Sequence, residues 1–371
     1  MAHFLIIGAG IVGLSVARSA MLAGHQATIL EQGPVPNPQS ASFDRHRMIR
    51  YPYGTAAGYT RMVTEAFGAW DRLWADLGTT HFESTGAIAI SLEPGDYAAK
   101  TLATFRAIGL PHDVLDRDAV EALCPHLTLP RGAWGVTAFP GGPLFAADII
   151  TDLVRWLTAA GARIEAGTRV VGLDEAEGRV TLADGSTRTG DFVLVAAGAW
   201  LPRLMPDRFG SLPVYRQALV YVEPPPAYAE SWRRAPAIAV LGDHTGYTLP
   251  DLRGAGLKIG YSAHRRQAMP DIDGFEADLA SESAVILGAF RPYLKDPDAY
   301  RPLRMQVGYY ALDPSRRFLF DKRGRTLVIT QCDGQMFKFG PLIGERVVAM
   351  VEGRETMASL ARWAAGDAPT P

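Results

Sequence analysis

Three glycines and a carboxylate near the start of the chain have the spacing of a dinucleotide-binding turn. Gly8, Gly10 and Gly13 follow an apolar run, and Glu31 ends the next apolar run. In such a turn the first glycine permits the tight connection, the second lets a pyrophosphate approach the backbone, and the third lets helix and strand pack closely. The carboxylate accepts hydrogen bonds from ribose hydroxyls. These residues predict a dinucleotide-binding site.

Basic residues occur at three further places where a cation could hold an anion. Arg50 ends a basic stretch that begins at Arg45, Lys338 precedes a helical pattern, and Lys258 interrupts an apolar run. An Arg fork accepts a carboxylate through two parallel bonds, and a Lys adds a point charge. Charged side chains usually lie in water, so Arg50 and Lys338 alone also fit a solvated surface. A lysine in an apolar, β-like run either has a chemical purpose or extends its ammonium to the surface.

The elements that must position these residues begin with a strand–helix–strand unit. The same alternation of apolar strands and helices returns in the middle and at the end of the chain. A hairpin turn is expected at Asp184-Gly185. Hydrophobic periodicity and breakers predict helices over Gly58–Leu77, Pro94–Gly109, Ala147–Ala160, Ser281–Tyr293 and Leu342–Glu352, with strands over Ala27–Leu30, Arg163–Ala166, Arg169–Leu173, Arg179–Leu182 and Thr326–Thr330, and from Asp191 to a glycine turn.

The composition narrows the class of protein. The chain has 371 residues, 48% of them hydrophobic, and a net charge of −2. This length allows a large core and favours two domains. We expect neither nucleic acid nor a membrane as a partner, because no long basic run and no membrane-spanning apolar run occur. Cys124 and Cys332 lie far apart, so we expect free thiols, no metal site and, without a signal-peptide pattern, a cytoplasmic protein.

Five motifs follow one another along nearly the whole chain, and together they are far more specific than the opening glycines. They are Ile7–Gly13, Arg47–Arg50 with Tyr53-Gly54, Val195–Trp200, Gly256–Tyr261 and Asp333–Phe339. In this order they resemble the D-amino acid oxidase superfamily of FAD enzymes, most closely the monomeric sarcosine oxidase and N-methyltryptophan oxidase group. The resemblance implies FAD as the cofactor and leaves NAD as the minor alternative.

The resemblance also implies the fold class. We expect an α/β protein in which a Rossmann-like FAD-binding domain is interleaved with an α+β substrate domain built on an antiparallel sheet. The FAD-binding domain would comprise residues 1–82, 141–213 and 305–371. The substrate domain would comprise residues 83–140 and 214–304.

Roles for individual residues follow from the same resemblance. Arg50 and Lys338 would bind a substrate carboxylate, and Tyr247 and Tyr310 would line the substrate pocket. Lys258 would lie near the flavin and promote its reoxidation by O2, since a positive charge stabilises the anion that forms. The expected cofactor-binding residues are Gly8, Gly10, Ile11, Val12, Gly13, Glu31, Gln32, Arg47, Val170, Ala197, Gly198, Trp200, Gly334, Gln335, Met336 and Lys338.

Several positions depart from the family pattern. Gly308 stands where relatives have the cysteine that links the flavin covalently, so we expect non-covalent FAD. Ser262 replaces an active-site histidine, and Arg45 and His46 replace an acid and a threonine. His46 either points into the substrate pocket or belongs to the loop alone, and both alternatives stay open.

The sequence therefore predicts an FAD-dependent oxidase that converts the C–N bond of a carboxylate-bearing amine, an N-alkyl or cyclic α-amino acid, to an imine. The cofactor carries such chemistry, with O2 as acceptor and H2O2 as product. The expected molecule is a monomer. One alternative is a dehydrogenase of the same fold with another electron acceptor. The other is a non-catalytic flavin-binding redox sensor, in which Arg50, Lys258 and Lys338 would have no purpose.

Overall fold

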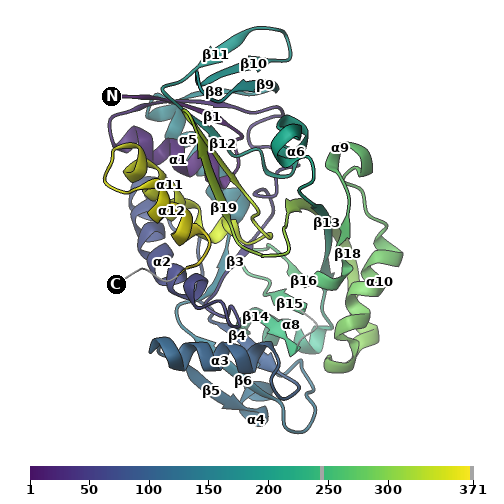
Figure 1. Cartoon of the computed structure of the whole chain (residues 1–371). Coiled ribbons are helices and arrows are strands. Elements are labelled where there is room, and N and C mark those ends of the chain that lie inside the picture. The colour runs from purple at the N-terminus through teal and green to yellow at the C-terminus, as the bar shows by residue number, and fades with distance from the viewer. Residues whose placement is uncertain (243–245, 368–371) are drawn as a thin grey trace.

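A computed structural model describes residues 1–242 and 246–367, and within them a largely parallel sheet surrounds the opening glycine turn (Figure 1). Strand β1 pairs in parallel with β2 and with β12, and the antiparallel pair is β19 with β20. The sheet order is β19-β20-β12-β1-β2-β8, with bounds Leu319–Arg323, Thr326–Thr330, Phe192–Val195, His3–Ile7, Gln26–Leu30 and Arg163–Glu165. Strands β1, β12 and β20 are buried almost throughout. Because both faces of such strands are covered, their sequences are continuous apolar runs.

Helices cover this sheet. Hydrophobic periodicity predicted three of them, α2, α5 and α11. Figure 1 shows α1, α5 and α11 beside the sheet, with α2 and α12 further out. The long α2 buries one face, including Trp70 and Leu73, and ends at Gly78 in the left-handed conformation. The bounds are Ile11–Leu22 for α1, Ala57–Leu77 for α2, Ala146–Ala159 for α5, Gly340–Val351 for α11 and Met357–Ala364 for α12.

A small antiparallel sheet lies above the parallel sheet in Figure 1. It has the order β11-β10-β9, with bounds Thr187–Thr189, Arg179–Leu182 and Val170–Asp174. The predicted turn at Asp184-Gly185 joins β10 to β11, and Gly185 adopts a φ of 84°. The hairpin prediction is therefore confirmed.

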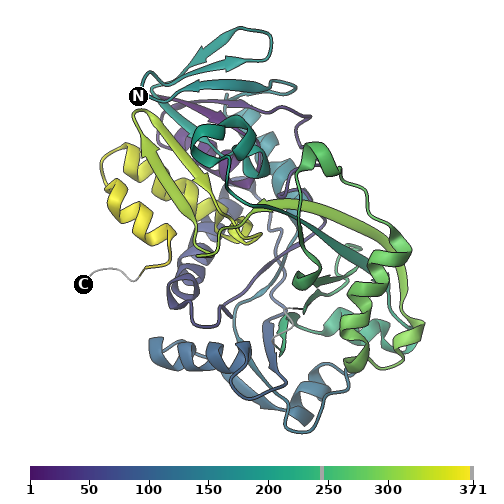
Figure 2. The same cartoon turned by 45° about the vertical axis from the view of Figure 1, so that its right-hand side comes forward.

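A second large sheet forms the other half of the molecule (Figure 2). Its order is β17-β13-β16-β15-β14-β4-β6-β5, and β18 also pairs with β13. Its pairs are antiparallel except that β14 runs parallel to β4. The strand bounds are Arg266–Gln267, Val214–Glu223, Leu257–Tyr261, Gly246–Leu249, Ala237–Leu241, Ala87–Ser91, Trp134–Ala138, Asp113–Asp116 and, for β18, Arg301–Ala311.

Shorter elements complete this half and the connections. Helix α10 packs against β13, β16 and β18, and α3 packs against β4 and β6. The helix bounds are Tyr97–Ile108 for α3, Arg117–Leu123 for α4, Leu201–Leu204 for α6, Pro206–Phe209 for α7, Ala229–Arg234 for α8, Pro270–Asp273 for α9 and Leu279–Phe290 for α10. Strands β3 (Arg47–Ile49) and β7 (Gly142–Leu144) form a separate pair between the two halves.

The α/β fold with an antiparallel second sheet agrees with the expectation from sequence. Strand β13 starts at Val214, the residue at which the expected substrate domain resumes. Strand β18 instead crosses the expected boundary at residue 305, because its pairing with β13 continues to Ala311. Residues 243–245 and 368–371, which belong to the expected domains, lie outside the described residues.

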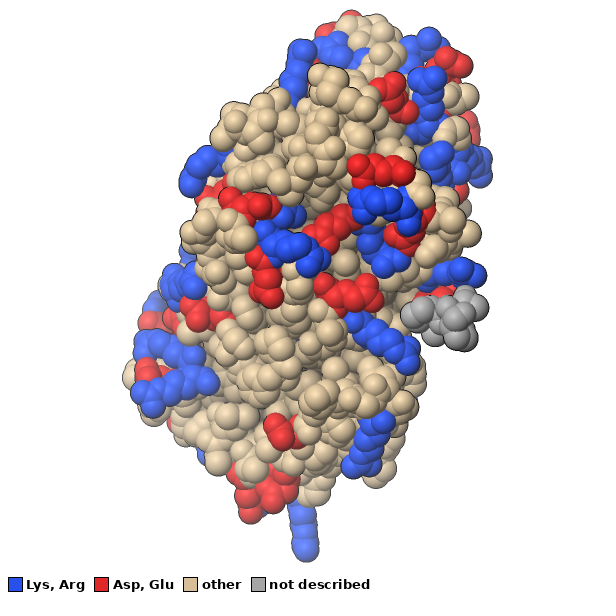
Figure 3. All heavy atoms as spheres, turned by 90° about the vertical axis from the view of Figure 1, so that its left-hand side faces the viewer, with Lys and Arg blue, Asp and Glu red and all other residues tan. Residues whose placement is uncertain are grey.

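The face formed by α2, α11 and α12 carries both signs of charge. Figure 3 shows Lys and Arg interspersed with Asp and Glu there. Several of these charges are paired, such as Arg72 with Glu345 at 2.6 Å and Arg317 with Asp367 at 2.8 Å. Among the described residues, no helix combines the length and apolar character needed to cross a membrane.

Candidate active site

One large cavity, about 930 Å³ in volume, is lined by residues of both halves. This is near the upper end of the range for small-molecule sites, so a ligand of dinucleotide size is appropriate. Its wall includes the β1–α1 turn, the loop before β3, the ends of β13, β16 and β18, and residues 329–338. Ala365, Gly366 and Asp367 also contribute, since Gly366 packs against Tyr59.

The opening glycines form a tight turn at one end of this cavity. Gly8 has a φ of 107°, and a Cβ there would lie 2.5 Å from the carbonyl oxygen of Ala196. A Cβ on Gly13 would lie 2.0 Å from the Gly8 oxygen, so this glycine serves the packing of α1 on β1. Gly8, Gly10, Ile11 and Val12 line the cavity, whereas Gly13 lies behind the wall.

Glu31 lines the cavity and also organises the loop that follows it. The carboxylate is 7% exposed. It accepts hydrogen bonds from the backbone N–H of Ala9 at 2.9 Å and of Gly33 at 3.0 Å, and from Asn37 Nδ2 at 3.0 Å. A carboxylate accepts about four hydrogen bonds, so capacity remains for a ribose hydroxyl. No local pattern singles out Asn37, which is six residues further along the chain.

The remaining cofactor candidates lie on the same wall. Gln32, Val170, Ala197, Gly198 and Trp200 all line the cavity. Gly198 adopts a φ of 55°, and a Cβ there would meet open space. The indole of Trp200 donates to Asp271 at 3.0 Å, so this tryptophan also ties the cofactor wall to α9.

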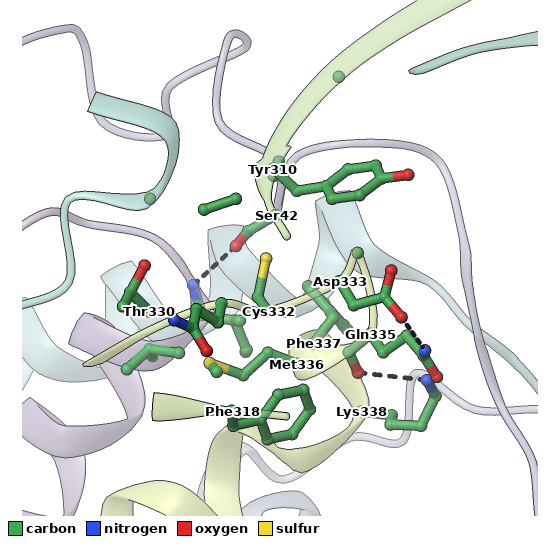
Figure 4. A pocket seen from close by; sticks show the side chains of 18 of the residues that line it. Ser42, Tyr310, Phe318, Thr330, Cys332, Asp333, Gln335, Met336, Phe337 and Lys338 are labelled. Carbon is green, nitrogen blue, oxygen red and sulfur yellow. Dashed lines mark hydrogen bonds between the residues drawn. The ribbon is translucent and has the colours of Figure 1, made fainter. Parts of the chain in front are cut away.

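The segment after β20 carries several polar groups into the cavity (Figure 4). Asp333 is buried and accepts hydrogen bonds from Arg316 Nη2 at 2.7 Å and from Gln335 Nε2 at 2.9 Å. Gln335 Oε1 is buried without a hydrogen-bond partner. Gly334, Gln335 and Met336, which the sequence predicted to bind the cofactor, line the cavity. Sequence reasoning missed the Arg316–Asp333 pair.

Arg50 and Lys338 come together at the cavity although 288 positions separate them. Arg50 Cζ lies 4.7 Å and Lys338 Nζ 5.5 Å from the centre of the Tyr53 ring. Lys338 is 5% exposed and donates to the backbone oxygen of Gln335 at 3.2 Å. Burial, with Arg50 nearby, lowers the pKa of Lys338 well below its ordinary value. Lys338 is buried and Arg50 is half-buried, so an anion that entered the cavity would stabilise both charges.

Neither cation is paired within the part of the chain that the structure describes. No carboxylate oxygen there lies within ion-pair distance of Arg50 or Lys338, and Arg50 Nη1 is buried without a hydrogen-bond partner. The hydroxyl of Tyr53 is likewise buried and unpartnered. These atoms form a polar subsite in the wall of the cavity. Such a group of hydrogen-bond donors suits a small anionic group.

Both predicted pocket tyrosines line the cavity. Tyr247 lies directly across from Gly260 in the β15–β16 pair, and a Cβ on Gly260 would be 2.2 Å from the Tyr247 ring. Gly260 therefore lets the ring lie flat on the neighbouring strand. Burial raises the pKa of Tyr247 to about 12 and also raises that of Tyr310, so both remain neutral phenols.

Lys258 lines the cavity, and its ammonium is paired with a carboxylate. Its side chain is 1% exposed, and Nζ donates to Asp44 at 2.9 Å and to the backbone oxygen of His46. Extension of the ammonium to the surface is thereby excluded. Arg47 also lines the cavity and binds the same carboxylate at 2.8 Å. Sequence reasoning missed Asp44, which lies in a polar loop 214 residues before Lys258.

Three of the four departures from the family pattern differ in where they lie. Ser262 lines the cavity, whereas Arg45 and His46 do not. His46 is fully buried and stacks with Tyr221 at 5.8 Å between ring centres, so the loop alternative holds. Arg45 donates to the backbone oxygen of Gly254 at 3.1 Å and links the two halves.

Gly308 and Cys332 both face the cavity. A Cβ on Gly308 would meet open space. Figure 4 shows the Cys332 sulfur turned toward the space between Ser42 and Tyr310. Burial raises the pKa of this thiol to about 11, so the thiol form predominates at neutral pH. Cys124 is buried in the core of the second half.

The model of the family described as FAD dependent oxidoreductase matches residues 3–350. The chain belongs to this family. Monomeric sarcosine oxidase of Bacillus sp. (strain B-0618) is 24% identical over 356 residues, which cover 92% of this chain and 90% of the relative. N-methyl-L-tryptophan oxidase of Yersinia pestis (strain Pestoides F) is 24% identical over 351 residues, 92% of each protein.

Solved structures confirm the fold of this FAD-dependent oxidoreductase. A modified fructosyl peptide oxidase from Aspergillus nidulans has a TM-score of 0.82 at 20% identity, covering 98% of this chain and 93% of that one. NikD, described as an unusual amino acid oxidase essential for nikkomycin biosynthesis, has a TM-score of 0.79 at 21% identity, covering 100% and 98%. The predicted family and fold class are thus confirmed.

The residues present fit FAD. The strained turn at Gly8 opens onto the N-terminus of α1, where N–H groups and the helix dipole favour phosphates. Glu31 lies beyond the second strand, and the open space at Gly198 and Gly308 lets the backbone approach a flat ligand closely. In this FAD-dependent oxidoreductase, the cations at Arg50 and Lys338 are a separate subsite of the same cavity.

Proposed function

We propose that this FAD-dependent oxidoreductase oxidises the C–N bond of a carboxylate-bearing amine, an N-alkyl or cyclic α-amino acid, to an imine. Water then hydrolyses the imine, and O2 receives the electrons to give H2O2. The names of relatives that act on sarcosine, N-methyl-L-tryptophan and fructosyl peptides support an amine next to a carboxylate.

The observation that carries this proposal is the unpaired cation pair. Lys338 is buried and Arg50 has a buried, unsatisfied Nη1 within the cavity. Leaving buried charges uncompensated is costly, so the site is built for an anion that arrives with the substrate. A carboxylate matches the Arg fork through two parallel bonds and accepts a third from the Lys ammonium.

Each residue then has a definite task. When bound, FAD supplies the acceptor for the hydride that leaves the carbon attached to nitrogen. Arg50 and Lys338 fix the carboxylate, which holds that carbon in one orientation. Tyr53, Tyr247 and Tyr310 form aromatic walls around the substrate and exclude water, and their raised pKa values keep them uncharged.

A second candidate is a dehydrogenase that passes electrons to an acceptor other than O2. Reoxidation of the reduced flavin in air separates the two candidates. A rapid return of the yellow colour supports the oxidase.

We further propose that FAD is held without a covalent bond and that one chain suffices for the site. Gly308 has no side chain to form a link, and burial keeps the Cys332 thiol protonated. The cations, the tyrosines and the glycine turn that line the cavity all come from a single chain.

The test is anaerobic bleaching of the flavin by a panel of compounds. N-alkyl and cyclic α-amino acids should reduce the flavin, and the matching amides should do so only at much higher concentration. Equal bleaching by acids and amides would contradict the carboxylate site. No bleaching by any amine would leave the redox-sensor alternative.

A further inference from the structure

A fully buried carboxylate, Asp44, receives four hydrogen bonds beside the cavity. Its Oδ1 accepts from the backbone N–H of Arg45 at 2.8 Å and from the hydroxyl of Tyr221 at 2.7 Å. Its Oδ2 accepts from Arg47 Nη1 at 2.8 Å and from Lys258 Nζ at 2.9 Å. The side chain is 0% exposed. Since a carboxylate accepts about four hydrogen bonds, Asp44 is fully committed to these neighbours.

The partners of Asp44 are fixed by the second sheet. Tyr221 on β13 is the direct cross-strand neighbour of Lys258 on β16 and of Arg304 on β18. Arg304 Cζ lies 3.7 Å from the centre of the Tyr221 ring. Asp44 approaches this row from the loop before β3. One carboxylate from one half of the molecule therefore meets a row of side chains from the other half.

The charge on Lys258 depends on this carboxylate. Burial is the strongest influence and lowers the pKa of Lys258 to about 8, and the nearby Arg47 and Arg304 act in the same direction. Asp44 opposes them and favours the charged lysine. Burial would raise the pKa of Asp44, but Lys258 and Arg47 hold it below its usual value. The ionisable groups facing Lys258 from the adjacent loop and strands are Asp44, His46, Arg47, Tyr221 and Arg304.

The same contacts determine the direction of the ammonium. Lys258 Nζ carries three N–H bonds, of which one points to Asp44 Oδ2 and another to the backbone oxygen of His46. The third has no acceptor among the described residues, and Lys258 lines the cavity. Two fixed bonds leave the third N–H a single direction.

We propose that Asp44 is a positioning residue, which keeps Lys258 charged at neutral pH and turns one of its N–H bonds into the cavity that would hold FAD. The inference rests on the proposed function, in which Lys258 acts in the reaction with O2. It adds a partner without which the lysine would be neutral and poorly oriented. Asp44 therefore determines the pH range over which the reduced flavin is reoxidised.

The test uses FAD-loaded Asp44→Asn, which keeps the size of the side chain and removes its charge. In the unaltered protein, reoxidation by O2 should slow as pH rises through about 8, where Lys258 loses its proton. In Asp44→Asn the same fall should occur about 1–3 pH units lower, the usual effect of an adjacent opposite charge. The rate should recover on acidification. A loss that is equal at all pH values would mean a structural role and overturn the proposal.

Two matched variants separate charge from packing. Tyr221→Phe removes one hydrogen bond to Asp44 but no charge, so the fall should stay near pH 8. A shift as large as that of Asp44→Asn would overturn the charge argument. Lys258→Arg keeps its charge at every pH in this range, so the fall should disappear with either residue at position 44. Its persistence would assign the transition to another group.

Sulfite, an anion that bleaches bound flavin, provides a measurement without turnover. The affinity for sulfite should change with pH near 8 in the unaltered protein and at a lower pH in Asp44→Asn. Lys258→Met, which lacks the titrating ammonium, should show no such change. If the unaltered protein is not reoxidised by O2, the oxidase proposal fails while sulfite still tests Asp44. If Lys258→Met is reoxidised as fast as the unaltered protein, Lys258 has no role in that step and the present inference fails while the oxidase proposal stands. If Asp44→Asn does not load FAD, the double variant with Lys258→Met should restore loading, because no unpaired ammonium remains. Failure of that rescue would overturn the proposal.

Discussion

Replacing Lys338 by Met should separate ligand binding from stability in this FAD-dependent oxidoreductase. Met has a similar length and fills the same space without a charge. The ammonium is 5% exposed and has no carboxylate partner within the described residues. Removing it should therefore weaken a bound carboxylate while relieving the ligand-free protein of a buried charge.

The magnitude follows from one charge-assisted hydrogen bond. Such a bond contributes about 1.5–3 kcal/mol. At 1.4 kcal/mol per tenfold, the dissociation constant of a carboxylate inhibitor should rise about 10- to 150-fold. Stability should move the other way. A lysine whose pKa is lowered by folding destabilises the protein below that pKa, and the effect vanishes only above the ordinary value of 10.5. The ligand-free Lys338→Met protein should thus unfold at an equal or higher temperature.

The assay is titration of the flavin absorbance with a thioether acetate and with its amide, together with thermal unfolding at neutral pH. Lys100→Met is the matched control, because Lys100 also lines the cavity but is exposed. It should change carboxylate affinity by less than about threefold, as expected for a solvated charge. The reasoning is refuted if Lys338→Met weakens acid and amide equally, or if Lys100→Met has the same effect.

Three further predictions concern pH, oxygen and the cofactor. Because burial and Arg50 lower the pKa of Lys338, carboxylate affinity should fall as pH rises through that lowered value, and titrations of Lys338→Met should lack this transition. Lys258→Met should leave anaerobic flavin reduction largely intact but slow reoxidation more than about tenfold, that is by over 1.4 kcal/mol; stopped-flow traces showing equal loss in both half-reactions would indicate a structural lysine. Acid or heat should release FAD from the precipitated chain, and the Cys332→Ser variant should release it equally. Flavin that stays with the polypeptide would show a covalent bond and contradict the inference drawn from Gly308.

Local patterns carried most of the correct predictions. The opening strand, glycine turn and helix depend on residues within one short segment, and amphipathic periodicity located α2, α5 and α10 to within a few residues. The Asp184-Gly185 hairpin depends on two adjacent residues alone. The gathering of Arg50 and Lys338 was inferred through family resemblance, since no local pattern brings these distant positions together.

The features that the sequence did not reveal depend on long-range contacts. Nothing in the loop around Asp44 indicates that a lysine on β16 will meet it, so the sequence predicted a role for Lys258 but not its carboxylate partner. Strand β18 continues to Ala311 because it pairs with β13 along its whole length. A strand end that is set by a distant partner strand leaves no local signal in the sequence. Asn37 binds Glu31 through a loop conformation that composition does not specify.

The cavity wall at residues 365–367 has a practical consequence for making fusions of this protein. Gly366 lies against Tyr59 and Asp367 pairs with Arg317 at 2.8 Å, so a fusion that pulled residues 365–367 out of these contacts would alter the cavity wall. Met1 is 93% exposed, and β1 separates it from the turn at Gly8 by five residues, about 17 Å of extended chain. A reporter domain or affinity handle joined before Met1 through a flexible tether would therefore leave the contacts of residues 365–367 intact.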